Sequence, residues 1–140
     1  MISSDLALAL RDAGLRWDPA AGDRFVIPQA DLDGELFTLS EMTIEAREYP
    51  TGTILGFNGT TEWALDSVAK DDVLWMPRED QLREHLGSAF VSLRRAEVGD
   101  GAPFQVTTWT SAGERTHEAD AAADAYALAL LALLTHVTHS

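Results

Sequence analysis

The sequence predicts an α+β fold: a mostly antiparallel, twisted sheet of about six to seven strands, with N-terminal, middle and long C-terminal helices packed on it. Three observations predict this class. Helical patterns open and close the chain, short segments of alternating apolar residues occupy its centre, and turn sequences separate those segments. Because 140 residues is an ordinary length for one domain, we expect a single domain over residues 1–140.

A helix of about ten residues is expected at the N-terminus. Leu6 and Leu10 lie at helical spacing, and Ser3 or Ser4 can cap the first turn through its hydroxyl. Gly14 is typical of a helix end, because glycine adopts the left-handed conformation at little cost.

The next part of the chain changes to strand patterns. Residues 25–28 predict a short strand that ends at a proline, which cannot donate to a ladder. From residue 36 onward apolar and polar residues alternate, so the polar ones are expected to face solvent. The expected buried face consists of Phe37, Leu39, Met42, Ile44 and Ala46.

Two turn sequences predict hairpins. Pro50 and Gly52 favour a tight reversal between two strands. Asn58-Gly59 tolerates positive φ at both residues, so it fits a two-residue type I′ turn between strands at 54–57 and 60–67. The alternative for the second strand is a helix that starts at residue 60.

A middle helix is expected to hold Pro77 in its first turn, to bury Leu82 and Leu86, and to end at Gly87. Strands are then expected at 90–95, 104–110 and 114–118. Asp120 is a natural cap for a last helix, whose alanines and leucines leave almost no polar face. Such a helix is either buried against a sheet or shared with another subunit, so a homodimer through the C-terminal helix is an open alternative.

Composition excludes several classes of protein. The chain has no cysteine, which excludes disulfides, a cysteine nucleophile and thiolate metal sites. Its net charge of −13 argues against direct binding to nucleic acid, and its longest apolar run is too short to span a membrane. The first residues lack the basic start of a secretory signal, so a cytoplasmic location is expected. No cofactor is predicted.

The four histidines are the first candidates for chemistry. His85 is expected near the C-terminal end of the middle helix, where it favours the helix dipole. His117 lies next to Glu118 and near two further carboxylates, and it could form a carboxylate–histidine pair. His136 and His139 are three residues apart and could hold a metal weakly, but no third ligand accompanies them.

The common catalytic motifs are absent from the sequence. It contains neither a Gly-x-Ser-x-Gly elbow nor a phosphate-binding loop. Acidic residues are dense between Glu62 and Asp80, and a solvated face is the expected role for most of them.

Tryptophans are more informative than ionisable residues. Trp75 and Arg78 stand at a loop-to-helix junction, and both types are enriched at interface anchors. The alternative is that the tryptophans belong to the core or its rim, where each N–H finds a partner. The candidate interface for a protein partner with a basic face comprises Trp63, Trp75, Arg78, Asp71, Asp72 and Glu79.

The stretches at 56–68, 74–82 and 124–131 resemble an uncharacterised family of short bacterial proteins, mostly from actinobacteria and similar GC-rich genomes. Its members are often labelled pilus assembly proteins of the CpaE type. CpaE proteins in the strict sense resemble MinD-like ATPases, whose phosphate loop this chain lacks. More loosely, the chain resembles small accessory proteins of phages and mobile elements. Neither resemblance implies catalytic residues.

These observations predict a small, non-catalytic protein-binding or adaptor domain of the bacterial cytoplasm. Two alternatives stay open. One is an acidic regulator of mobile-element conflict, such as an immunity protein, an antitoxin or a nucleic-acid mimic. The other is an enzyme with a histidine or carboxylate site.

Overall fold

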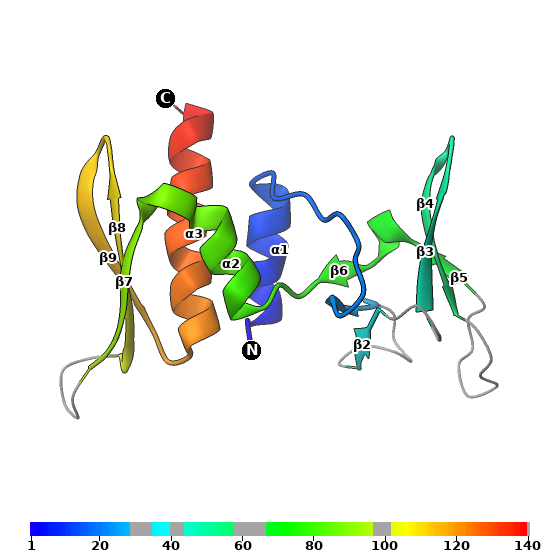
Figure 1. Cartoon of the computed structure of the whole chain (residues 1–140), viewed down its shortest axis with the longest axis horizontal. Helices are drawn as coiled ribbons and strands as arrows, with labels where there is room; N and C mark the ends of the chain where they lie inside the picture. Colours follow the sequence, from blue (N-terminus) through cyan, green and yellow to red (C-terminus); the bar gives the residue numbers. More distant parts are fainter. Residues whose placement is uncertain (29–34, 40–43, 58–66, 97–101, 140) are drawn as a thin grey trace. The chain divides into compact units, whose positions relative to one another are not determined.

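The computed structural model confirms an α+β fold with antiparallel sheets (Figure 1). It describes residues 1–28, 35–39, 44–57, 67–96 and 102–139. The described residues contain three helices and nine strands, slightly more strands than expected. The strands form three separate three-stranded sheets instead of one. Two of these sheets consist of strands that follow one another in the sequence, and the third takes one strand from a distant part of the chain.

The chain divides into two compact units. The first, here called the helical unit, comprises Met1–Arg16 and Pro77–Ser140; the second, the central unit, comprises Trp17–Met76. The prediction of a single domain over residues 1–140 stays a prediction. Among the described residues, no helix combines the length and the apolar character that crossing a membrane requires.

Helix α1 (Ser4–Asp12) begins and ends as its sequence predicts. The Ser3 hydroxyl accepts a hydrogen bond from the Leu6 amide at 3.3 Å. Gly14 has a φ of 108°, and the amide after it, that of Leu15, donates to the Leu10 carbonyl at 3.0 Å. The Ser3 amide also donates to the Asp124 carboxylate at 2.7 Å, which ties the start of α1 to the first turn of α3.

Helix α2 (Glu79–Leu86) follows a cap at Arg78, whose amide donates to the Gln81 side chain at 2.9 Å. Leu82 and Leu86 are buried, as predicted, and Gly87 ends the helix with a φ of 55°. Pro77 stands before the cap and not in the first turn, because the Gln81 side chain selects Arg78 as the capping residue.

The third sheet of the molecule belongs to the helical unit and contains β7 (Phe90–Arg95), β8 (Phe104–Thr110) and β9 (Gly113–Ala119). Their positions agree with the three strands predicted there. Helix α3 (Ala122–His139) packs on β8 and β9 and also contacts α1 and α2. In Figure 1 the helices of this unit lie on one face of the sheet and leave its other face uncovered within the unit.

Helix α3 begins at Ala122, and the residue before it, Ala121, accepts the first helical hydrogen bond. The start is therefore one residue later than the predicted cap at Asp120 implies. Its apolar surface is used inside the unit: Ala125, Ala127 and Leu130 are almost fully buried, and the Tyr126 ring packs against Phe90 of β7 with centroids 5.8 Å apart. The homodimer through this helix stays a prediction.

The central unit contains two sheets. One comprises β1 (Arg24–Val26), β2 (Leu36–Thr38) and β6 (Leu74–Trp75), in the order β2-β1-β6. The other comprises β3 (Ile44–Tyr49), β4 (Gly52–Phe57) and β5 (Ser67–Ala69), in chain order, and a 3-10 turn at Lys70–Asp72 follows it.

The predicted hairpin at Pro50 and Gly52 is confirmed by β3 and β4, which pair with Tyr49 opposite Gly52. The predicted turn at Asn58-Gly59, and the choice between a strand and a helix after it, lie outside the described residues. Strand β5 nevertheless pairs antiparallel with β4, and Ser67 lies opposite Gly56.

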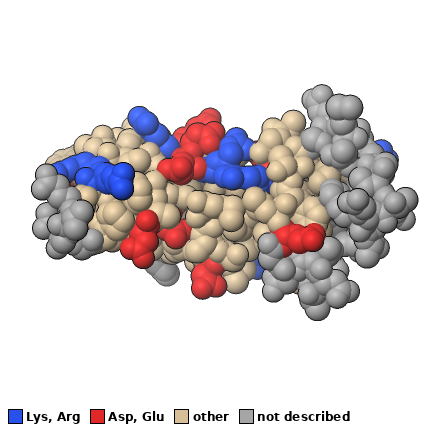
Figure 2. Space-filling view, turned by 90° about the horizontal axis from the view of Figure 1, so that it is seen from below, with Lys and Arg blue, Asp and Glu red and all other residues tan. Residues whose placement is uncertain are grey.

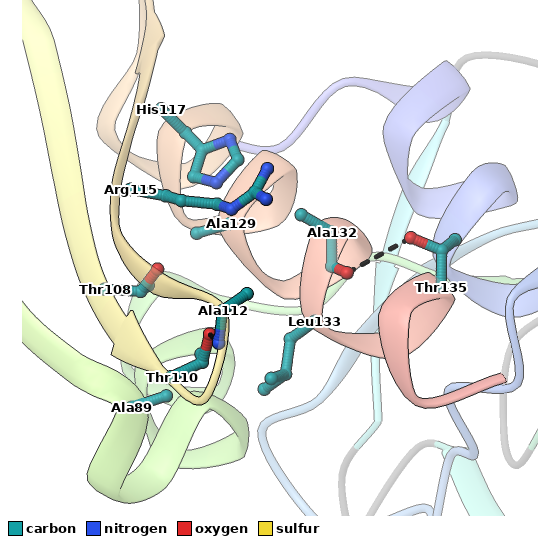
Figure 3. Close-up of a pocket in the computed structure, with 10 residues that line it drawn as sticks. All are labelled: Ala89, Thr108, Thr110, Ala112, Arg115, His117, Ala129, Ala132, Leu133 and Thr135. Carbon is teal, nitrogen blue, oxygen red and sulfur yellow. Dashed lines mark hydrogen bonds between the residues drawn. The ribbon is translucent and has the colours of Figure 1, made fainter. Parts of the chain in front are cut away.

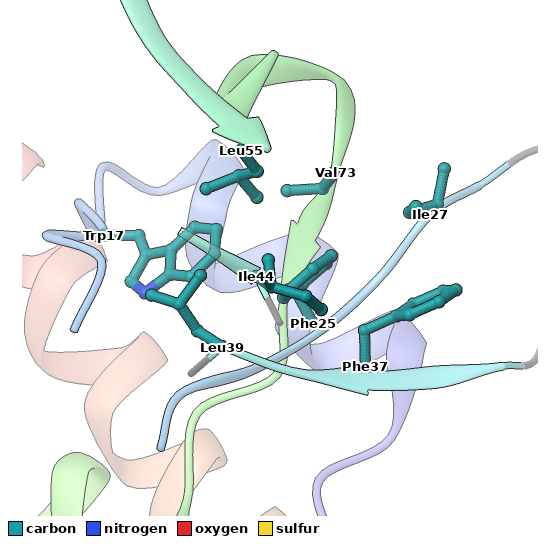
Figure 4. Packing of buried hydrophobic residues seen from close by; sticks show 8 residues of the cluster. All are labelled: Trp17, Phe25, Ile27, Phe37, Leu39, Ile44, Leu55 and Val73. Atoms are coloured by element: carbon teal, nitrogen blue, oxygen red, sulfur yellow. The ribbon is translucent and has the colours of Figure 1, made fainter. Parts of the chain in front are cut away.

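One prediction for the buried face is wrong. Ile44 is buried, but Ala46 is exposed, because β3 is an edge strand that enters the core at its first residue and extends past it. Met42 lies outside the described residues. The core of the central unit joins both sheets through Trp17, Phe25, Ile27, Phe37, Leu39, Ile44, Leu55 and Val73 (Figure 4).

Candidate functional site

The predicted interface residues of the central unit have different roles. Trp75 is half-buried and stacks on Trp17, with ring centroids 6.2 Å apart and planes 9° from parallel. Asp71 and Asp72 are exposed in the 3-10 turn. Trp63 lies outside the described residues. The structure therefore brings Trp75 together with a core tryptophan and leaves the two acids in solvent.

The predicted interface residues of the helical unit lie at the start of α2. The half-buried Arg78 donates from its Nε to the Asp80 carboxylate at 3.1 Å, and this hydrogen bond lowers the pKa of Asp80. Glu79 is exposed. Arg78 is thus engaged by a neighbour in its own helix.

Trp17 has the core role that was the alternative for the tryptophans. Its Nε1 donates to a carboxylate oxygen of the buried Asp23 at 2.9 Å, and the Ala20 amide donates to the same oxygen at 3.0 Å. Lys70 donates to the Trp17 carbonyl at 3.1 Å. These contacts fix the loop before β1 and explain why this indole is buried.

Trp109 differs from Trp17 and Trp75 in its exposure. It lies near the end of β8, and 62% of its surface is accessible. Side chains alternate along a strand, so Trp109 points away from the face that carries the buried Val106 and Thr108. It therefore belongs to the sheet face that the helices leave uncovered, which we call the outer face.

The outer face is otherwise polar. Across the ladder Glu114 lies opposite Trp109, and Thr116 lies opposite Thr107, with their hydroxyls 3.0 Å apart. Glu118 lies opposite Gln105 and accepts its amide at 3.1 Å. On β7, Arg94 lies opposite Gln105. One large exposed aromatic residue thus stands directly opposite one carboxylate, that of Glu114, on a paired strand.

The opposite, inner face of the same strands borders a cavity of about 310 Å³ (Figure 3). Thr108, Thr110, Arg115 and His117 line it from the sheet. Small or aliphatic side chains line it from the rest of the unit: Ala89, Ala112, Ala129, Ala132 and Leu133, with Thr135 at the last turns of α3. In Figure 3 the Arg115 and His117 side chains lie next to each other and point from β9 toward α3.

His117 does not form the carboxylate pair that was considered for it. Glu118 points to the outer face, where it binds Gln105, and Asp124 accepts the Ser3 amide. The His117 Nε2 atom is buried and has no hydrogen-bond partner among the described residues. Burial lowers the pKa of His117 below its ordinary value of 6.5, and the nearby positive charge of Arg115 lowers it further.

A pH dependence of stability follows from this pKa. The unfolded chain takes up the His117 proton at higher pH than the folded chain does, so we expect the free energy of unfolding to fall as the pH drops through about 6.5. The contribution of His117 to this fall ends below the folded pKa. Urea titrations at a series of pH values should show a smaller fall in His117→Gln, and also in Arg115→Gln, which lacks the repelling charge. Parallel curves for wild type and His117→Gln would contradict the expectation.

The remaining histidines lie on the helices where they were predicted. His85 is exposed near the C-terminal end of α2. His136 and His139 lie in the last turn of α3, where the structure describes the backbone only. Within the described part of the chain, no group of three histidine or acidic side chains is arranged to hold a metal ion.

Sequence reasoning missed Trp109 and Arg115, although a signal for both was present. Strand β8 alternates in two phases: Phe104, Val106 and Thr108 share one face, and Trp109 falls on the other. The same alternation in β9 places Arg115 with His117 and apart from its acidic neighbours. What was lacking was the knowledge of which face the helices cover.

No protein-family model, no curated protein and no solved structure matches the chain. The resemblance to short bacterial proteins therefore stays a prediction, and function has to be argued from the chain's own surfaces.

Proposed function

We propose that the chain is a small, non-catalytic protein-binding domain that docks its partner on the outer face of the sheet β7-β8-β9. The observation that carries the proposal is the exposure of Trp109, with 62% of its surface accessible at a paired position near the end of β8. A buried indole needs no further role, but a large exposed one on a regular sheet is a favoured interface anchor. The bacterial cytoplasm is the proposed location.

The charges around Trp109 favour a partner with a basic face. The exposed Glu114 lies directly opposite Trp109, whereas Glu118 lies four residues further along β9, in the same cross-strand row as Gln105 and Arg94. The net charge of −13 adds a long-range attraction for a basic partner. On the face drawn in Figure 2, the described residues of the helical unit show both acidic and basic groups. The charges near Trp109 therefore favour a protein partner with a basic face over the alternative of nucleic-acid mimicry.

The first experiment identifies the partner and tests the surface together. A photoactivatable phenylalanine analogue at position 109, expressed in the source organism, should crosslink one or a few defined proteins. The same analogue at Tyr49, an aromatic residue of the central unit with 50% exposure, is the matched control and should not crosslink them. Recovery of the same proteins from both positions would contradict the proposal.

The second experiment measures the contribution of the anchor. With the purified partner, Trp109→Ala should raise the Kd by about 30-fold, because loss of an interface anchor costs about 2 kcal/mol or more. Glu114→Lys should also weaken binding, and rising salt should weaken the wild type. Tyr49→Ala should leave the Kd within about twofold, as expected of residues outside an interface. An unchanged Kd for a folded Trp109→Ala would rule out this docking face.

A further inference from the structure

We propose that the cavity between the inner face of β8 and β9 and helix α3 binds a small organic monocarboxylate, with the carboxylate at Arg115 and an apolar body against α3. This site is separate from the proposed docking face. The described residues that line it all belong to the helical unit.

Short side chains of α3 and of the segment before β7 line the cavity opposite the sheet. Ala129 and Ala132 face the sheet across the cavity, and Ala89 closes one side. Its volume of about 310 Å³ lies at the lower end of the range for small-molecule sites. The size suits a ligand of one ring or a short aliphatic chain.

The polar groups converge from the sheet. Arg115 forms no ion pair with any described residue, although acids outnumber bases 23 to 10 in the chain. No carboxylate is among the described residues that line the cavity. The hydroxyl-bearing side chain of Thr108 and the buried Nε2 of His117 lie on the same wall, and the latter has no partner among the described residues. An anion bound at Arg115 would supply an ion-pair partner for the guanidinium and a hydrogen-bond partner for the His117 Nε2 atom.

A single negative charge fits the wall better than a double one. Arg115 is the one permanent cation among the lining residues that the structure describes, and burial together with Arg115 lowers the pKa of His117, which keeps the imidazole neutral. The guanidinium offers two parallel N–H donors that match a carboxylate. A phosphate dianion would bring a second charge that no lining residue balances. The alanines and Leu133 of α3 offer the remainder of the ligand an apolar surface.

The alternation of β9 makes this proposal independent of the docking proposal. Arg115 and His117 face the cavity, whereas Glu114 and Glu118 face outward. A substitution at Arg115 tests the cavity without altering the outer face. The failure of one proposal is therefore distinguishable from the failure of the other.

The test is a titration followed by ¹H–¹⁵N correlation spectra of the whole chain. The probes are benzoate and hexanoate, with benzamide and hexanamide as uncharged controls of the same shape. We expect saturable shifts confined to residues around the cavity on β8, β9 and α3. The amides should bind at least about tenfold more weakly, since they lack the charge-assisted pair with Arg115.

Three variants locate the site. Arg115→Gln should weaken benzoate binding by about tenfold or more, and Ala132→Leu should abolish it by filling the cavity. Arg94→Gln, which removes a cation from the outer face of the same sheet, is the matched control and should bind benzoate like the wild type. Thermal unfolding without ligand checks that each variant is folded. If Ala132→Leu does not fold, the binding measured with Arg115→Gln decides the test.

Four outcomes would overturn the proposal. They are the absence of saturable binding of either carboxylate, equal binding of acids and amides, unchanged binding in a folded Arg115→Gln, and tighter binding of inorganic phosphate than of benzoate through Arg115. The last result would assign the cavity to an inorganic anion instead.

Discussion

Replacing Phe25 with alanine is expected to lower the free energy of unfolding by about 3–5 kcal/mol, the usual cost of removing a buried aromatic side chain. Phe25 is fully buried and lies opposite Phe37 on one neighbouring strand and Trp75 on the other. Its ring centroid is 5.5 Å from that of Phe37 and 5.7 Å from that of Trp17 (Figure 4). Truncation therefore opens a cavity where three core aromatic residues meet.

Urea unfolding followed by far-ultraviolet circular dichroism measures this loss, because that signal does not depend on the tryptophans of the cluster. Tyr49→Ala is the matched control: it also removes an aromatic ring from the central unit, but the ring is half exposed, and a change within about 0.5 kcal/mol is expected. A loss below about 1 kcal/mol in Phe25→Ala would mean that the packing around this ring is not as described.

Replacing Asp23 with alanine is expected to cost about 2–4 kcal/mol, because two donors lose their acceptor in the interior. One carboxylate oxygen accepts both the Trp17 Nε1–H and the Ala20 amide, and Asp23 is 3% exposed. The Asp23 backbone also binds Leu39 at the end of β2, where its carbonyl accepts the Leu39 amide at 2.7 Å. The side chain thus holds a loop that the sheet already anchors through the backbone.

The matched control for this prediction is Asp23→Asn. The asparagine carbonyl can take the place of the shared oxygen and accept both hydrogen bonds, but without the negative charge that strengthens them. We expect a loss of about 1 kcal/mol, clearly smaller than that of Asp23→Ala. Equal losses in the two variants, measured by urea unfolding, would show that the charge and not the acceptor geometry matters at this position.

Local chemistry made much of the fold predictable. The cap at Ser3, the left-handed Gly14 and the reversal after Tyr49 depend on residues a few positions apart, so their conformations follow from short stretches of sequence. The strands β7 and β8 agree with the predicted bounds for the same reason. Helix α3 was predictable because alanine and leucine favour helix and leave no polar face.

Pairing between distant segments was not predictable. β1 takes β6 as its neighbour, so Phe25 lies opposite Trp75, a residue for which the sequence alone left both an interface role and a core role open. The same sequence does not indicate that Trp17 would bury its indole against Asp23. Alternation can say which residues share a face, but only the packing of other elements decides which face is buried.

The candidate site shows this division most clearly. The sequence determined that β8 and β9 would each carry two sets of alternating side chains, and that the chain would be strongly acidic. The docking of α3 decided the rest: it covers the face with Val106 and leaves Trp109 in solvent, and it forms a cavity that the exposed Arg115 and the half-buried His117 line opposite two alanines. Helix packing is a long-range event set by the shape of both surfaces, so exposure and cavities emerge only in the tertiary structure.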